Sequence, residues 1–238
     1  MKTLEFQVPL HQGTLLKRYK RFLADVRLED GRELTVMCPN TGTMKTCNEP
    51  GRPVIISDSL NDSRKYRFTW EMIRMGRSWV GVNTGNPNRA VTKWVEAGMI
   101  PELTGYGTLK REQKYGRDGR SRIDLLLSDG AAASDCFVEV KNTTMRVGHH
   151  AAFPDAVTTR GQKHLRELMD VVDQGGRGVM FYFVGRADCD RFRPADEIDP
   201  EYGRLLREAA TKGVELLPYR VRFNKAGMKL EERLPVDL

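Results

Sequence analysis

One short alternating segment carries residues that could perform chemistry. In residues 137–141, Glu139 and Lys141 are separated by a single valine. Side chains alternate between the two faces of a β-strand, so Glu139 and Lys141 are predicted to share one face while the valines point into a core. The pattern therefore predicts a strand with one polar face, on which a carboxylate and an ammonium group lie side by side.

A second acid lies on the preceding predicted strand. Asp124 stands among apolar neighbours, and 14 residues separate it from Glu139, enough for a hairpin that brings the two carboxylates together. Two adjacent carboxylates repel unless they share a cation, and hard oxygen ligands suit Mg²⁺ or Mn²⁺. The alternative is structural: Asp124 pairs with Arg122 or Lys141, and Glu139 is solvated at an edge.

The elements that position these acids follow from apolar spacing. Asn86 followed by Pro87 predicts a helix N-cap, and Gly98 predicts the end of that helix. The further expected elements are strands at 107–115, 121–127 and 136–141, a helix at 159–173, a buried strand at 179–184, a helix near 200–212 and a strand near 214–223. The first six of these elements have the order αβββαβ.

The N-terminal third of the chain has a pattern of short strands instead of alternating strands and helices. Phe22, Ala24, Val26 and Leu28 alternate as an inward-facing row, and Asp30-Gly31 marks a hairpin reversal. Five or six short strands without a good helix predict a small barrel of the OB type over residues 1–83. The expected fold class is α+β with two domains: this OB-like barrel, then an α/β domain over residues 84–238.

Composition narrows the class of partner. The chain has 238 residues and a formal charge of +7, and residues 1–83 hold 14 basic and 9 acidic side chains, which favours a polyanionic partner. Four cysteines without C-x-x-C spacing and a start without a signal-peptide pattern predict a reduced, cytoplasmic protein. No apolar run approaches the roughly 20 residues of a membrane helix.

Basic and aromatic residues interleave near the first predicted hairpin. Tyr19 and Phe22 lie among four cations, Lys17, Arg18, Lys20 and Arg21. This composition suits nucleic acid, through phosphate contacts and base stacking. The same alternation also describes an amphipathic strand with a core aromatic and a solvated basic face.

Several longer motifs resemble one known family. They are Cys38-Pro39-Asn40-Thr41-Gly42-Thr43-Met44, Glu112-Gln113-Lys114-Tyr115-Gly116, Ser121-Arg122-Ile123-Asp124, Glu139-Val140-Lys141-Asn142, Phe153-Pro154-Asp155-Ala156-Val157-Thr158 and Arg160-Gly161-Gln162-Lys163-His164-Leu165-Arg166-Glu167-Leu168. Together they resemble the sugar fermentation stimulation protein A family of prokaryotes, over nearly the whole chain.

The resemblance implies a fold and a set of roles. It implies an OB-like domain joined to a PD-(D/E)xK nuclease-like domain, and an association with DNA. By similarity Asp124 is the motif aspartate, Glu139 the second acid and Lys141 the signature lysine. The chain departs from the fuller nuclease pattern at Ile123, which stands where proline can precede the aspartate, and in the loop at 145–152.

Other polar residues are candidates for the same site. Glu112, on the strand before Asp124, is a further ligand or base, or else an exposed acid in a basic strand. Gln162 and Arg160 open the predicted helix and are expected to contact phosphate or water, or else to be solvated. The pair His149-His150 has no third ligand at zinc spacing and is expected to lie in a mobile loop near the site.

Two functions fit these expectations. In the first, the protein binds DNA with weak sequence specificity and hydrolyses phosphodiester bonds with Mg²⁺ or Mn²⁺ held by Asp124 and Glu139. In the second, it is a DNA-binding regulator of sugar-utilisation genes that keeps a nuclease-like fold without turnover.

Overall fold

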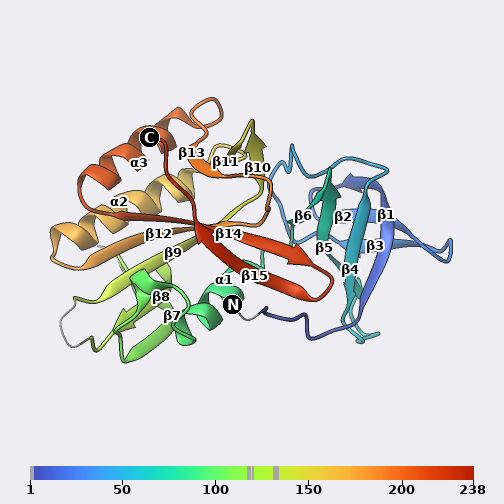
Figure 1. Ribbon diagram of the computed structural model, residues 1–238, viewed down its shortest axis with the longest axis horizontal. Helices are drawn as coiled ribbons and strands as arrows, with labels where there is room; N and C mark the ends of the chain where they lie inside the picture. The colour runs from blue at the N-terminus through green and yellow to red at the C-terminus, as the bar shows by residue number, and fades with distance from the viewer. Residues whose placement is uncertain (1–2, 117–118, 120, 131–133) are drawn as a thin grey trace.

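A strand barrel is followed by a sheet with helices on both faces in the computed structural model, which describes residues 3–116, 119, 121–130 and 134–238 (Figure 1). The barrel strands are β1 (Leu10–Tyr19), β2 (Leu23–Leu28), β3 (Glu33–Met37), β4 (Pro53–Asp58), β5 (Phe68–Met75) and β6 (Ser78–Gly81). They pair in the order β3-β2-β1-β4-β5-β6, and a parallel contact between β3 and β5 closes the barrel. The predicted OB-like architecture is confirmed.

The predicted hairpin at Asp30-Gly31 is confirmed, but one residue of its alternating row lies elsewhere. Strands β2 and β3 pair antiparallel, and Gly31 turns with φ +87°. Ala24, Val26 and Leu28 are buried as expected. Phe22 is not: it precedes β2 in a turn, and its side chain is 47% exposed.

The second domain has the predicted αβββαβ order. Its elements begin with α1 (Asn86–Glu96), the 3₁₀ turn η1 (Pro101–Leu103), β7 (Thr108–Tyr115), β8 (Ser121–Ser128) and β9 (Cys136–Thr143). They continue with α2 (Thr159–Asp173), β12 (Arg177–Val184), α3 (Pro200–Thr211), β14 (Glu215–Asn224) and β15 (Gly227–Arg233). The strands pair in the order β15-β14-β12-β9-β8-β7. Strand β15, which forms one edge, was not predicted.

Strand β12 is buried on both faces, as expected of a strand in the middle of a sheet covered by helices. Three alternate residues, Val179, Phe181 and Phe183, pack in the cluster that contains α1. Their neighbours Met180, Tyr182 and Val184 pack in the cluster that contains α2 and α3. Figure 1 shows α2 and α3 on one side of the sheet and α1 on the other. None of the helices in the described part of the chain combines the length and apolar character that crossing a bilayer requires.

The segment at 145–152 is a hairpin, not the expected loop. Strands β10 (Met145–Val147) and β11 (His150–Phe153) pair through a tight turn in which Gly148 has φ +60°. Strand β13 (Arg191–Pro194) pairs with β11 and completes a small sheet. His150 is fixed by Asp237, with Nε2 2.8 Å from Oδ2. The described contacts thus give His150 a structural partner.

A buried carboxylate joins the barrel to the second domain. Glu71 is 5% exposed and accepts hydrogen bonds from Ser57 (2.7 Å), from Asn83 (2.9 and 3.0 Å) and from Asn86 (2.8 Å). Asn86 therefore does not cap α1 as predicted; Gly85 occupies the N-cap position, without a side-chain bond. The amide of Asn86 is used across the joint because a buried carboxylate needs donors on both oxygens.

We expect Glu71→Ala to lower the free energy of unfolding by about 3 kcal/mol, because it leaves the buried amide of Asn86 and the half-buried amide of Asn83 without their acceptor. Urea denaturation measures the loss. Ser57→Ala is the matched control, since it removes one donor and leaves the carboxylate bonded; its expected cost is about 1 kcal/mol. Equal stability of Glu71→Ala and wild type would contradict this account of the joint.

Candidate active site

Asp124 lies where strands β8 and β9 separate. The ladder between them runs from Leu127 opposite Cys136 to Leu125 opposite Val138. Beyond it, the backbone N–H of Val140 donates to Asp124 Oδ2 at 2.7 Å. The other carboxylate oxygen accepts from Asn88 Nδ2 on α1 at 2.6 Å. The side chain of Asp124 thus takes the place of a strand partner and is fixed on both oxygens.

Glu139 is held on one oxygen only. Its side chain is almost fully buried, and Oε1 lies 2.7 Å from Lys141 Nζ and also contacts His164 Nδ1. Arg160 Nε donates to His164 Nε2 at 3.3 Å, and Lys141 Nζ lies 3.2 Å from His164 Nδ1. Glu139 Oε2 is buried and has no hydrogen-bond partner among the described residues.

The two carboxyl groups have pKa values shifted in opposite directions. Burial, followed by the negative charge of Glu139, raises the pKa of Asp124 to about 6. Burial would also raise the pKa of Glu139, but the charge of Lys141 and the hydrogen bond from His164 hold it below its ordinary value. Glu139 is therefore ionised at neutral pH and disfavours a second negative charge on Asp124.

A divalent cation fits this arrangement. Glu139 Oε2 is an unsatisfied acceptor, and a cation near both carboxylates would offset the repulsion that raises the pKa of Asp124. Within the described ranges, no group of three His, Cys, Asp or Glu side chains could hold a metal ion. Asp124 and Glu139 would thus offer two carboxylates, a number that suits Mg²⁺ because that ion usually keeps several waters.

Two further residues predicted for the site lie in different surroundings. Glu112 is exposed with φ +52°, and the pairs Arg111–Leu125 and Gln113–Ile123 on either side of it place it opposite Asp124. Gln162 Nε2 instead donates to both oxygens of Asp199, at 2.9 and 3.1 Å. Asp199 is the N-cap of α3, so the described contacts of Gln162 fasten two helices together.

Sequence reasoning missed His164 and Asn88. The signal for His164 was its position on α2, on the same buried face as Gly161, Leu165 and Leu168. A polar side chain on an otherwise apolar helix face needs a buried partner, and here that partner is Glu139. Asn88 had no comparable signal, because its bond to Asp124 depends on how α1 packs against the sheet.

The cations predicted to bind DNA differ in how many hydrogen bonds and ion pairs they form within the protein. The Arg18 guanidinium donates to the carbonyls of Arg21, Asn40 and Gly42 at 2.7, 2.8 and 2.9 Å, so it braces a loop. Lys17 Nζ is 3.4 Å from Asp25 and lies 5.3 Å from the centre of the Tyr19 ring, although its side chain is 67% exposed.

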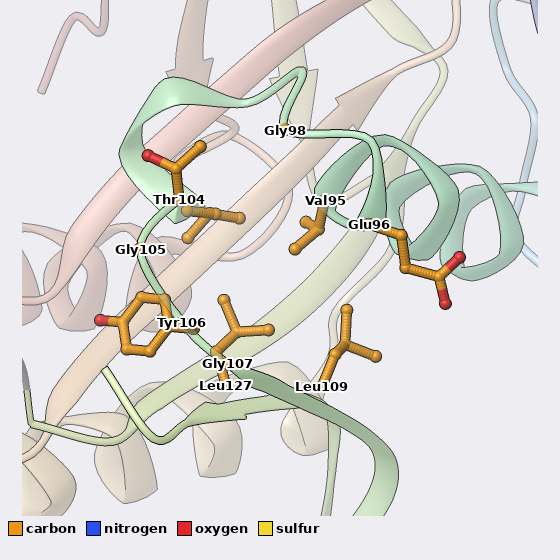
Figure 2. Close-up of a pocket in the computed structure, with 10 residues that line it drawn as sticks. Val95, Glu96, Gly98, Thr104, Gly105, Tyr106, Gly107, Leu109 and Leu127 are labelled. Carbon is orange, nitrogen blue, oxygen red and sulfur yellow. The ribbon is translucent and has the colours of Figure 1, made fainter. Parts of the chain in front are cut away.

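A pocket of about 500 Å³ lies away from the acids, between the end of α1 and the start of β7 (Figure 2). Its apolar lining includes Val95, Leu109 and Leu127. Glu96 is its one carboxylate, and it pairs with Lys93 at 2.8 Å. We assign no chemistry to this pocket.

Comparison with known proteins gives matches over both domains. Residues 16–82 match the family model described as the SfsA N-terminal OB domain, and residues 85–227 match the sugar fermentation stimulation protein RE domain. Sugar fermentation stimulation protein homologs of Geobacter metallireducens and Pelobacter propionicus are 52% and 54% identical to the chain. These alignments cover 99% and 97% of this chain and 100% and 98% of the relatives.

A solved structure is similar over the whole length. SfsA of Pyrococcus furiosus, in complex with Ca²⁺, is 29% identical, with a TM-score of 0.88 and complete coverage of both chains. The order of the barrel and the nuclease-like sheet therefore recurs in an experimental structure.

We expect the stability of Asp124→Asn relative to wild type, measured in EDTA, to rise by about 1 kcal/mol between pH 5 and pH 8, because the amide does not ionise. A carboxyl whose pKa rises on folding stabilises the protein fully below its unfolded pKa and loses that contribution as pH rises through about 6. The stability of the variant relative to wild type should therefore fall as pH falls from 8 to 5. Urea denaturation across this range measures it.

Asp25→Asn is the matched control, with the opposite expected sign. Burial would raise the pKa of Asp25, but hydrogen bonds from Thr35 and Tyr19 hold it below its ordinary value. Replacing it should therefore lower stability at pH 8. A stability difference between Asp124→Asn and wild type that does not change with pH would contradict the environment described for Asp124.

Proposed function

Because the chain belongs to the sugar fermentation stimulation protein family and places two acids beside a lysine, we propose that it binds DNA and hydrolyses phosphodiester bonds at a divalent-metal site. The observation that carries this proposal is Glu139 Oε2, a buried acceptor without a partner in the described structure, next to Asp124. A protein that only binds DNA gains nothing from buried acids facing a polyanion.

Asp124 and Glu139 would hold the ion, which we propose to be Mg²⁺ or Mn²⁺. The similar Pyrococcus furiosus protein was solved with Ca²⁺, another hard cation that takes oxygen ligands. When bound, the ion would polarise a phosphodiester oxygen and lower the pKa of a coordinated water. The hydrogen bonds from Asn88 and Val140 would hold the Asp124 carboxylate in a fixed orientation beside the ion.

The remaining residues have roles that follow from their contacts. Lys141 Nζ, 2.7 Å from Glu139, would position the attacking water or offset the charge that develops on the phosphate. His164 would keep Glu139 Oε1 occupied so that Oε2 faces the ion. Glu112, opposite Asp124, would supply a further ligand or a base. A role for Gln162 requires its amide to leave Asp199.

Free cations beside the acids support contact with a DNA backbone. Many arginines of this domain are ion-paired, for example Arg177 with Glu215 and Arg220 with Glu231. By contrast, the exposed cations Lys110, Lys114 and Arg122 have no ion pair with any residue that the structure describes. Lys114 pairs directly opposite Arg122, two residues from Asp124.

One observation favours the alternative, a DNA-binding regulator without turnover. Lys141 and His164 already hold Glu139 Oε1, so this acid is partly compensated without a metal ion. A site of this kind could persist as a structural remnant of a nuclease fold.

We expect wild type to cut linear, single-stranded or branched DNA with Mg²⁺ or Mn²⁺ and not with EDTA. Asp124→Ala should reduce the rate by about 10²–10³-fold or more, because it removes half of the carboxylate donor set. Gel assays with labelled substrates measure the rate. Asp173→Ala is the control, since Asp173 is an exposed acid paired with Lys212 at 3.1 Å.

Calorimetric titration with Ca²⁺ separates metal binding from turnover. Wild type should bind the ion, and Glu139→Gln should weaken binding at least about tenfold. DNA binding without cutting on every substrate would favour the regulator, and cutting that survives in Asp124→Ala would exclude the proposed site.

The cations beside the acids give a separate expectation. Replacing Lys110, Lys114 and Arg122 together by Gln should lower the slope of log affinity against log salt for duplex DNA by about 2 to 3, because each phosphate contact contributes about 0.9. Fluorescence anisotropy at several salt concentrations measures the slope. The control replaces Arg166, Arg204 and Lys212, which are all ion-paired, by Gln. Equal slopes in both variants would remove these cations from the DNA contact.

A further inference from the structure

The turn between β1 and β2 has an unfavourable backbone. Lys20 and Arg21 have φ values of +49° and +65°, in the left-handed region that favours glycine. Left-handed conformations are strained for non-glycine residues, and tight hairpin turns usually place Asn or Gly there. Two consecutive long cationic side chains are therefore kept where the backbone disfavours them.

Hydrogen bonds from outside the turn hold this conformation. Arg18 donates to the carbonyl of Arg21 at 2.7 Å and also to the carbonyls of Asn40 and Gly42. The N–H of Cys38 donates to the carbonyl of Phe22 at 2.7 Å. These bonds use only the backbone of the turn. The cationic groups of Lys20 and Arg21 form no ion pair with a described residue.

Phe22 adds a second unfavourable feature. It continues the apolar row of Ala24, Val26 and Leu28, yet its ring is 47% exposed while those three side chains are buried. Among the large hydrophobic side chains that are exposed in the described ranges, it is the aromatic one. Left about half exposed, the ring of Phe22 forgoes part of the free energy that full burial would contribute.

We propose that this tip, residues 20–22, binds an unpaired nucleobase. The inference rests on the nucleic-acid binding of the proposed function and names its substrate class, a strand with unpaired bases. The ring of Phe22 stacks on the base, and Lys20 and Arg21 contact the phosphates on either side. A paired base within a duplex has both faces covered, so only an unpaired base can use this ring.

The tip is tied to the side of the molecule that carries the start of α2. The loop that Arg18 braces continues to Thr43 and Met44, which donate to Asp155 at 2.8 and 3.0 Å. Asp155 lies four residues before Thr159, where α2 begins, and Arg160 on that helix contacts His164 of the acidic site. The hydrogen bonds of this loop thus connect the tip with the segment that precedes α2.

The test measures binding and stability together on the full chain. The probe is a fluorescein-labelled 15-nucleotide oligodeoxythymidine in EDTA, with a blunt duplex of the same length for comparison. Phe22→Ala should weaken oligodeoxythymidine binding about tenfold or more and leave duplex binding within about twofold. The double variant Lys20→Asn/Arg21→Gly should also weaken single-strand binding, yet raise the Tm, because it relieves the left-handed strain.

Leu60→Gly is the matched control. Leu60 is also a non-glycine residue with positive φ, +54°, and its side chain is 63% exposed, but its neighbours Asp58 and Asp62 are acidic. This variant should raise the Tm without changing affinity for the oligonucleotide.

The outcomes distinguish this inference from the proposed function. Tip variants that bind oligodeoxythymidine as tightly as wild type overturn the inference and leave the proposed function intact. Equal losses of affinity for the single strand and the duplex in Phe22→Ala overturn base stacking. Failure of wild type to bind either probe overturns the proposed function, and the inference with it.

Discussion

The burial of Glu139 is the constraint on which the site depends. An isolated buried carboxylate is too costly to keep ionised, so its charge must be met by groups supplied from elsewhere in the fold. Lys141 comes from the same strand face, and His164 comes from α2, which therefore has to pack on β9 with one polar residue on its apolar side. Arg160, one turn earlier, in turn donates a hydrogen bond to the other ring nitrogen of His164. The hydrogen bond to Glu139 thus depends on the apolar packing of α2, because that packing places His164 beside the carboxylate.

The joint between the domains also depends on carboxylates whose hydrogen-bond donors come from another part of the fold. Glu71 in the barrel and Asp155 before α2 each place a carboxylate against donors from the other side of the joint. Close backbone contact adds to this: a Cβ on Gly81 would lie 2.1 Å from the ring of Phe223, so only glycine fits there. Carboxylates need directional donors, and a glycine contact tolerates little displacement, so the barrel and the sheet are fixed in one relative position.

Local patterns sufficed to predict the elements and part of the site. Period-two alternation placed Glu139 and Lys141 on one face, and helical spacing located α2, because both depend only on neighbours in the chain. The missed features depend on distant segments. Asn86 was expected to cap its own helix but donates to Glu71 in the barrel, and Arg18 resembled a free cation but binds carbonyls more than 20 residues away. Phe22 followed the apolar row in sequence, but β2 begins one residue too late to bury it.

The net charge of the acidic site relates metal binding to phosphate binding. Above pH 6 the site holds two carboxylates against the one ammonium group of Lys141, so a phosphate that approaches it meets net negative charge. A divalent cation reverses that sign and lowers the pKa of Asp124, since an adjacent positive charge favours the ionised carboxyl. Under the proposed function, phosphate binding at the acids would therefore require the cation, whereas the cations of β7, β8 and the β1–β2 turn would attract the DNA backbone without it. In the proposed function, nucleic acid would thus contact the surface cations first, and a phosphate would reach the acids once a metal ion is bound there.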